Sequence, residues 1–161
     1  MKRSSLVLAG AALLGTGAVA AALFTQHALG MQPCPWCVLQ RLIFLAIAAA
    51  ALLGLAVPRI GSALMLALAN CGIAAALYQH FVAAASASCN LTFADRVIST
   101  LTLDELAPAV FMATASCADA KVNLMGVPYE FWSLALFVVL EAAALWVLRD
   151  SLAPTVTARR R

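Results

Sequence analysis

The sequence predicts an all-α integral membrane protein, a bundle of four transmembrane helices, and three observations favour this fold class. Of the 161 residues, 65% are hydrophobic and only 11% are charged, whereas soluble domains carry about 25% charged residues. The mean hydropathy is +0.98. Charged side chains are absent from three long stretches, 4–40, 42–58 and 60–94. A soluble bundle could not cover its surface with so few charges, and a net charge of +3 gives no support for nucleic-acid binding.

Four stretches are long enough to span a membrane as helices, which takes about 20 mostly apolar residues. We expect these spans at about 6–26, 38–57, 61–82 and 130–148. The first has a basic start, an apolar run and an Ala-Val-Ala stretch, features that also occur in cleavable signal peptides. Its apolar run exceeds the roughly 7–15 residues of the apolar region within a signal peptide, so we expect a retained helix.

The distribution of Lys and Arg predicts the orientation, because these residues collect in cytoplasmic loops. Placing both termini in the cytoplasm puts seven basic residues on that side: Lys2, Arg3, Arg59, Arg149, Arg159, Arg160 and Arg161. Only Arg41, Arg96 and Lys121 then lie at or beyond the outer surface. The sequence therefore predicts a single membrane domain, 1–161, with a long outer loop at about 83–129 and a cytoplasmic tail at 149–161.

The outer loop contains one predicted helix, in the stretch "TLDELAPAVFM". Thr102 and Glu105 fit a capping box, in which each side chain satisfies a free backbone donor. The apolar residues that follow lie roughly on one face. Such a short helix could rest on the membrane surface or pack onto the top of the bundle, and both alternatives stay open.

Five cysteines are present: Cys34, Cys37, Cys71, Cys89 and Cys117. Cys71 falls in the middle of the third span, where we expect a small core residue. The other four face the outer side, and disulfides persist where that compartment is oxidising. Four cysteines allow three pairings, of which we favour Cys34–Cys37 with Cys89–Cys117.

The CxxC motif of Cys34 and Cys37 could bind a metal, staple the fold or carry electrons. A zinc site commonly needs two short-spaced pairs or added histidines, and Cys89 lies 28 residues from Cys117. Closing that longer loop could stabilise the fold by about 3–4 kcal/mol, whereas the short ring would contribute only about 2 kcal/mol. A short exposed ring is better suited to opening and closing, so we expect no metal.

The neighbours of the CxxC motif also favour redox chemistry. Pro35 suits the first turn of a helix, which places Cys34 and Cys37 at the positive end of the helix dipole. Helix N-termini and nearby cations lower the pKa of thiols. Arg41 follows Cys37 by four residues and shares its helix face. An arginine just inside a span is a functional hypothesis, although it could instead extend to lipid phosphates.

Two histidines end spans at the same height as the thiols, His27 after the first span and His80 after the third. They could simply fill the membrane interface. Thiols, a cation and imidazoles at one surface suit an exchange of two electrons and two protons, because Arg41 and His80 can stabilise an oxyanion on a lipid-dissolved acceptor such as a quinone. Arg41, His80 and His27 are therefore candidate quinone-binding residues. For Glu141, within the fourth span, we expect a hydrogen bond to a neighbouring helix.

The order of these features resembles a known family. A first span is followed by CxxC with an arginine four residues on, two spans, an outer loop with two separated cysteines, and a last span. The stretches "FTQHALGMQPCPWCVLQR" and "VFMATASCADAKVNLMGVPYEFW" resemble the two loop signatures of the DsbB family. These are bacterial inner-membrane quinone reductases that reoxidise the periplasmic oxidant DsbA. The resemblance covers nearly the whole chain.

The resemblance implies roles for individual residues. Cys34 and Cys37 match the quinone-facing pair, with Cys37 as the thiolate nearest the quinone. Arg41 matches the arginine needed for quinone use, and His80 resembles the histidine near the quinone ring. Gln40 stands where the best-known member has an acidic residue.

The resemblance also implies a partner and a reaction. Cys89 and Cys117 match the pair that meets the partner, with Cys89 forming the mixed disulfide. The implied function is reoxidation of a DsbA-type periplasmic thiol oxidase, with electrons passed to ubiquinone or menaquinone. The implied location is the bacterial inner membrane, with the active cysteines on the periplasmic side.

Three alternatives stay open at this point. The chain could be a structural or metal-binding membrane subunit that uses its cysteines as ligands or staples. It could be a family relative that serves a different dedicated oxidant. A thiol reductase carrying cytoplasmic electrons outward would prefer cysteines within the membrane on both sides, and only Cys71 is placed there.

Overall fold

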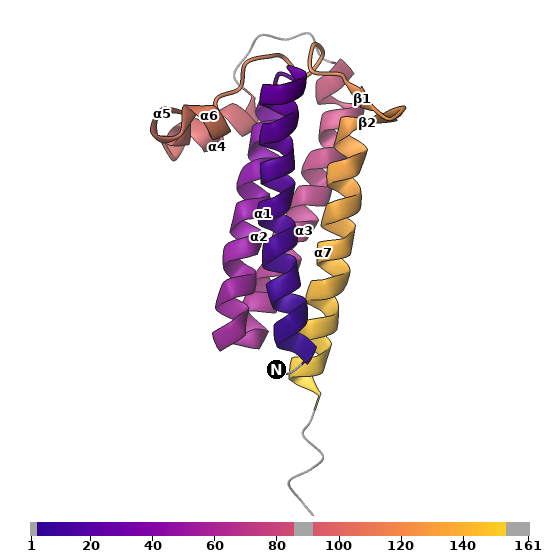
Figure 1. Cartoon of the computed structure of the whole chain (residues 1–161). Coiled ribbons are helices and arrows are strands. Elements are labelled where there is room, and N and C mark those ends of the chain that lie inside the picture. The colour runs from indigo at the N-terminus through magenta and orange to yellow at the C-terminus, as the bar shows by residue number, and fades with distance from the viewer. Residues whose placement is uncertain (1–2, 86–91, 154–161) are drawn as a thin grey trace, which may run out of the picture.

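Four long helices form the body of the protein in the computed structural model, which describes residues 3–85 and 92–153. They are α1 (Arg3–Leu29), α2 (Pro35–Ala56), α3 (Pro58–Phe81) and α7 (Tyr129–Leu152), and they run side by side (Figure 1). Within the described residues these four are long and apolar enough to cross a membrane. The predicted fold class, an all-α four-helix membrane protein, is confirmed, and each helix overlaps the range expected from the sequence.

The short elements gather at one end of the bundle (Figure 1). They are η1 (Ala83–Ala85), α4 (Phe93–Thr100), α5 (Leu103–Leu106), α6 (Pro108–Phe111), β1 (Asn123–Leu124) and β2 (Val127–Pro128). The two strands pair antiparallel as a minimal hairpin. The N-terminus of α1 and the C-terminus of α7 lie at the opposite end of the bundle.

Prolines set the starts of α2 and α3. Pro35 and Pro58 each occupy the first turn of a helix, where the fixed φ suits the helix and the missing N–H has no partner to lose. Val57 is the single residue between α2 and α3. The chain therefore reverses direction within a very short turn, and α2 and α3 pack against each other from this turn onward.

Two glycines allow this tight packing near the turn. A Cβ atom on Gly61 would lie 2.3 Å from the Cα of Gly54 and 2.7 Å from the carbonyl oxygen of Ala50. Small residues let helix backbones approach closely where no hydrophobic effect drives association. Only glycine fits at position 61 without moving one helix away from the other.

Gly61→Ala is expected to destabilise the bundle by about 1–3 kcal/mol, the usual cost of forcing an extra carbon into a packed core. The control is Gly10→Ala, because an added Cβ at Gly10 meets no atom within 4 Å. Thermal unfolding in detergent, followed by helical circular dichroism, measures both variants. Equal midpoints for the two variants would contradict the packing role of Gly61.

The helices of the outer loop differ from the predicted single helix. The capping box expected at Thr102 is wrong: Thr102 has φ +53°, and its side chain makes no capping bond. The helix expected from there is two separate turns, α5 and α6, because Ala107 precedes Pro108 and leaves the helical region. The capping box lies instead at the start of α4, between Thr92 and Asp95.

The outer helices α4 and α6 pack on the bundle, and α4 and α5 also expose apolar side chains. Ile98 and Phe111 are buried together with Val38 of α2, so this region does pack onto the top of the bundle. Phe93 and Leu106 are exposed on the same segment, at 66% and 76%. Packing onto the bundle is therefore confirmed for part of the segment, and contact with the membrane surface stays a prediction.

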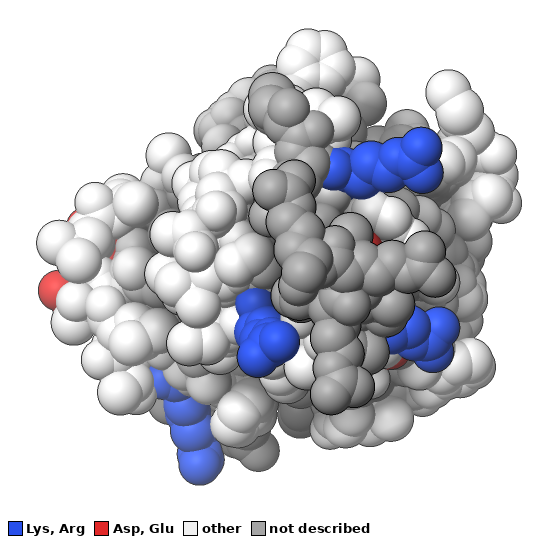
Figure 2. Space-filling view, turned by 90° about the horizontal axis from the view of Figure 1, so that it is seen from below, with Lys and Arg blue, Asp and Glu red and all other residues white. Residues whose placement is uncertain are grey.

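The end of the bundle opposite the outer helices is rich in basic residues. Figure 2, seen from below, shows several Lys and Arg side chains and few acidic ones. Arg59 donates from Nε to the carbonyl oxygen of Ser151 at 3.0 Å. Ser4 donates to Asp150 at 2.5 Å. These bonds tie α3 and α1 to the end of α7.

Two predictions within the spans have different outcomes. The expected hydrogen bond of Glu141 is confirmed, because Asn70 of α3 donates to it at 3.3 Å. The expectation that Cys71 belongs to the core is wrong. Cys71 is exposed on the outer face of α3, since the core-facing positions around it are Ala69 and Gly72.

Candidate functional site

The CxxC motif lies at the N-terminus of α2, as its Pro35 predicts. Cys34 is the N-cap residue, and its sulfur accepts a hydrogen bond from the backbone N–H of Cys37 at 3.3 Å. The two sulfur atoms are 2.7 Å apart. Cys34 is fully buried, whereas Cys37 is half-buried. The motif therefore has an inner cysteine and a more accessible one.

Cys117 lies beside Cys34, although 83 residues separate them in the sequence. The backbone N–H groups of Thr114 and Ala115 both donate to the carbonyl oxygen of Pro33, at 3.0 and 3.3 Å. This contact holds the outer loop against the segment that precedes Cys34. Cys89 lies outside the described residues, so the pairing Cys89–Cys117 stays a prediction.

Neighbouring sulfurs shift the pKa values of Cys34 and Cys117 in opposite directions. Hydrogen bonding to Cys117, then to Cys37, together with burial, raises the pKa of Cys34. Hydrogen bonding from Cys34 lowers the pKa of Cys117. The expectation that the helix N-terminus lowers the pKa of Cys34 is therefore wrong, because its sulfur is buried and donates its proton. In the dithiol form the Cys34 thiol is therefore the hydrogen-bond donor and the Cys117 sulfur the acceptor.

Removing the Cys34 thiol is expected to raise the pKa of Cys117, because hydrogen bonding from Cys34 is the largest cause of its lowering. As the pH is lowered, the alkylation rate of Cys117 should fall at a higher pH in fully reduced Cys34→Ala protein than in the unsubstituted protein. The rate of reaction with a small alkylating reagent across pH, with mass-spectrometric assignment, measures this. Cys71→Ala is the control, and an equal pH midpoint in Cys34→Ala would contradict the assigned donor.

Arg41 is buried inside the protein, so the alternative in which it extends to lipid phosphates is wrong. Its exposed fraction is 5%. Its Nη1 donates to the side-chain oxygen of Gln26 on α1 and to the carbonyl oxygen of Val110 on α6, both at 2.8 Å. One guanidinium nitrogen thus joins α1 and α6 to α2, and it leaves other N–H groups of Arg41 for a further acceptor.

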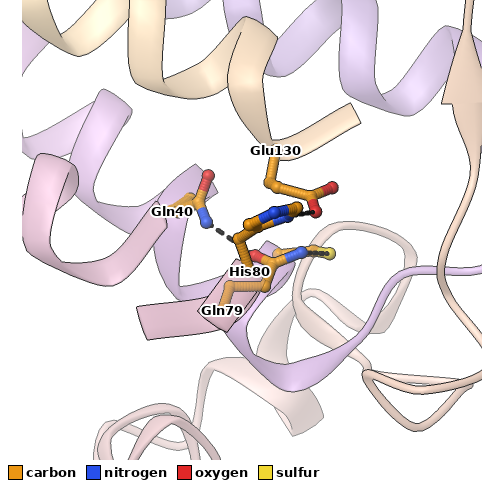
Figure 3. Close-up of polar contacts among 5 residues, drawn as sticks. Gln40, Gln79, His80 and Glu130 are labelled. Atoms are coloured by element: carbon orange, nitrogen blue, oxygen red, sulfur yellow. Dashed lines mark hydrogen bonds and ion pairs between the residues drawn. The ribbon is translucent and has the colours of Figure 1, made fainter. Parts of the chain in front are cut away.

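Two buried glutamines connect α2 and α3 to the thiol of Cys37 (Figure 3). Gln40 donates to the side-chain oxygen of Gln79 at 2.7 Å. Gln79 in turn donates from Nε2 to the sulfur of Cys37 at 3.2 Å. Gln79 was not among the residues predicted from the sequence. The sequence could have pointed to it, since a polar residue one position before His80 in an apolar span is itself unusual.

His80 pairs with a carboxylate that the sequence did not single out. Its Nδ1 lies 2.6 Å from Oε1 of Glu130, at the start of α7 (Figure 3). Its ring lies 4.8 Å from that of Phe81 and 4.6 Å from that of Phe131, measured between ring centres. Glu130 is 8% exposed. The pair joins α3 to α7 at the height of the thiols.

A cavity of about 260 Å³ opens among these helices. Most of its wall is apolar, and includes Ala18, Phe44 and Leu136. Its polar lining comes mainly from α2, α3 and the start of α7: Cys37, Gln40, Arg41, Gln79, Tyr129 and Glu130. Tyr129 is joined to Thr25 of α1 by a hydroxyl–hydroxyl bond of 3.1 Å. The cavity is therefore a mostly apolar chamber with one thiol and one cation in its wall.

The predicted site residues fall into two groups. The structure brings together Cys34, Cys37, Arg41 and Cys117, of which Cys37 and Arg41 line the cavity. His80 stands behind Glu130 and does not line the cavity itself. His27 is exposed near the end of α1 and does not line the cavity.

The chain is similar to curated proteins over most of its length. Residues 3–147 match the family described as disulfide bond formation protein DsbB. A "Disulfide bond formation protein B" from Herminiimonas arsenicoxydans is 33% identical over 157 residues, covering 94% of this chain and 97% of that protein. A protein of the same name from Pseudomonas syringae pv. tomato is 32% identical, covering 86% of each chain. The chain therefore belongs to the DsbB family of membrane proteins for disulfide bond formation.

Proposed function

We propose that this protein is a quinone-dependent thiol–disulfide oxidoreductase that reoxidises a DsbA-type periplasmic thiol oxidase. The proposal is carried by one observation: Cys37 and Arg41 both line the same mostly apolar cavity. A thiol in the wall of a mostly apolar cavity among membrane-spanning helices can pass electrons to an apolar acceptor such as a quinone. The names of the relatives, which specify disulfide bond formation, support the same chemistry.

The lining of the cavity fits a quinone, either ubiquinone or menaquinone. Ligand sites of this kind are mostly apolar, with a few placed polar groups that fix orientation. Phe44 and Leu136 supply apolar wall for a ring, and Arg41 supplies N–H donors for a carbonyl oxygen that gains negative charge. A bound quinone would supply the sink for two electrons and two protons.

The proposed exchange steps use the position of Cys117 beside Cys34 and the predicted Cys89–Cys117 disulfide. A thiolate of the reduced partner attacks Cys89 of the Cys89–Cys117 disulfide, and Cys117 leaves as a thiolate. Cys117 then attacks Cys34 of the Cys34–Cys37 disulfide, which releases Cys37 as a thiolate at the cavity wall.

The remaining exchanges close the cycle. The partner's second thiolate attacks the mixed disulfide and releases Cys89. Cys89 attacks Cys117, which reforms the outer disulfide and releases Cys34, which takes up a proton. The partner has lost two electrons, and the Cys34–Cys37 pair has gained them. Arg41 stabilises negative charge at the cavity while this pair is reoxidised.

The proposed location is the bacterial inner membrane, with the whole chain as one membrane domain. The four long helices would be the spans, and the cysteine-bearing end would face the periplasm. The basic residues at the opposite end support this orientation (Figure 2), because Lys and Arg favour the cytoplasmic side. The apolar side chains exposed on α4 and α5 support contact of the outer loop with lipid.

The proposal is tested by measuring quinol formation with the purified full-length protein, a reduced DsbA-type partner and a quinone. Quinol should form only when all three are present, and its amount should equal the partner disulfide formed. Thiol trapping should show Cys34 and Cys37 reduced by quinol and reoxidised by quinone. Partner oxidation without quinone, or thiols protected by a bound metal, would overturn the function.

A further inference from the structure

Two uncharged side chains, Gln79 and Gln40, form a hydrogen-bonded chain that ends at the sulfur of Cys37. Gln40 donates to Gln79 at 2.7 Å, and Gln79 donates to the Cys37 sulfur at 3.2 Å (Figure 3). Both amides are buried, with exposed fractions of 3% for Gln40 and 6% for Gln79. A buried amide that lost its partner would carry an uncompensated desolvation cost, so the three side chains act as one unit.

The direction of the bonds decides which form of the thiol is favoured. The side-chain oxygen of Gln79 is occupied by the N–H of Gln40, so its own N–H group faces the sulfur. A donor aimed at sulfur stabilises the negative thiolate, and bonds to charged groups are roughly twice as strong as neutral ones. A carboxylate in the place of either glutamine would instead bring negative charge toward that thiolate.

We propose that Gln79 is a catalytic residue that raises the reduction potential of the Cys34–Cys37 couple by donating to the Cys37 thiolate. Gln40 is a positioning residue that holds the Gln79 amide in the donating orientation. The inference rests on the proposed function, in which this couple is reduced and reoxidised in each cycle. In this way two uncharged residues, Gln79 and Gln40, help to set the reduction potential of the Cys34–Cys37 couple.

The electron balance shows why the bond acts on the potential. Two electrons from the Cys117 and Cys89 thiolates, through disulfide exchange, break the Cys34–Cys37 bond. Cys34 takes up one proton, and Cys37 remains a thiolate that accepts the N–H of Gln79. The thiolate exists only in the reduced form, so its stabilisation makes the disulfide a stronger oxidant, as for other dithiol oxidants whose reduced form is stabilised.

The inference also explains why glutamine suits position 40 in this chain. A couple that oxidises the dithiol of a strong oxidant must itself be strongly oxidising. Arg41 lines the same cavity as Cys37 and supplies positive charge there. The glutamines add further stabilisation of the thiolate without adding another charge to a mostly apolar cavity, where unpaired charge is costly.

The test is a redox titration of the Cys34–Cys37 pair in the full chain without quinone or partner. Cys71, Cys89 and Cys117 are replaced by serine, so that only this pair is titrated against dithiothreitol or glutathione buffers. Gln79→Leu is expected to lower the equilibrium constant for reduction about tenfold, a shift of about 30 mV toward more reducing potential. Gln40→Leu is expected to give a smaller shift in the same direction.

Asn70→Leu is the matched control, because it removes an amide from α3 that bonds to Leu66 and Glu141 rather than to a thiol. It should leave the potential unchanged. The alkylation rate of Cys37 in the reduced proteins is a second readout, expected to fall several-fold in Gln79→Leu and not in Asn70→Leu. Helical circular dichroism identifies any variant that does not fold, and Gln40→Leu then carries the test.

The outcomes separate this inference from the proposed function. An unchanged potential in folded Gln79→Leu or Gln40→Leu, with wild-type protein that reduces quinone, would overturn the inference alone. A lowered potential in Gln79→Leu, together with wild-type protein that forms no quinol, would overturn the proposed function and leave the role of Gln79 standing. A shift of equal size in Asn70→Leu would assign the effect to general destabilisation and overturn the inference.

Discussion

Replacing Cys37 by serine is expected to lower quinol formation roughly a thousandfold or more, which corresponds to about 4 kcal/mol in activation free energy. Cys37 is the cysteine in the cavity wall, whereas Cys34 is fully buried behind it and keeps its proton. A serine hydroxyl does not form an anion at neutral pH without an activating base. The assay is quinol formation with a reduced DsbA-type partner.

The same variant should still react with the partner. The first attack needs only the Cys89–Cys117 disulfide, so Cys37→Ser protein should form a mixed disulfide between Cys89 and the partner, visible on non-reducing gels after rapid thiol blocking. Cys71→Ser is the control, because Cys71 is exposed on the outer face of α3, and it should retain the normal rate. Normal reoxidation of the partner by Cys37→Ser in the presence of quinone would exclude the proposed electron route.

The fold was predictable because a membrane restricts the choice. A backbone within lipid must satisfy its own hydrogen bonds, so long apolar stretches become helices. Charge-free stretches and prolines at 35 and 58 then set the approximate helix ranges. The outer loop was less predictable. The pattern at Thr102 and Glu105 fits a capping box, but Pro108 ends that helix after a single turn.

The site was predictable where its residues are neighbours in one helix. Cys34, Cys37 and Arg41 share the first turns of α2, so helix geometry alone brings them together. The partners that complete the site come from other helices. Gln79 is 42 residues from Cys37, and Glu130 is 50 residues from His80. Such contacts depend on how each helix is rotated about its axis. A helix that is apolar on all faces does not show which face points into the bundle.

Arg41→Met is expected to lower quinol formation about a hundredfold to a thousandfold, the usual effect of removing one preorganised donor to developing negative charge. The methionine fills similar space but leaves Gln26 and the Val110 carbonyl without their donor. Steady-state rates across quinone concentration measure the effect. The fall should be mainly in kcat, since the charge develops during reduction and is absent from bound oxidised quinone.

Arg41→Lys distinguishes the charge from the geometry of the guanidinium. Lysine keeps the positive charge but cannot present several N–H groups in a fixed plane, so it should recover part of the rate and remain about tenfold below wild type. Arg59→Met is the control: that arginine bonds to the Ser151 carbonyl at the opposite end of the bundle, and its loss should leave quinone reduction within about twofold. Wild-type kcat in Arg41→Met would remove the cation from the mechanism, and the cavity would then bind its acceptor through apolar contacts and the glutamines alone.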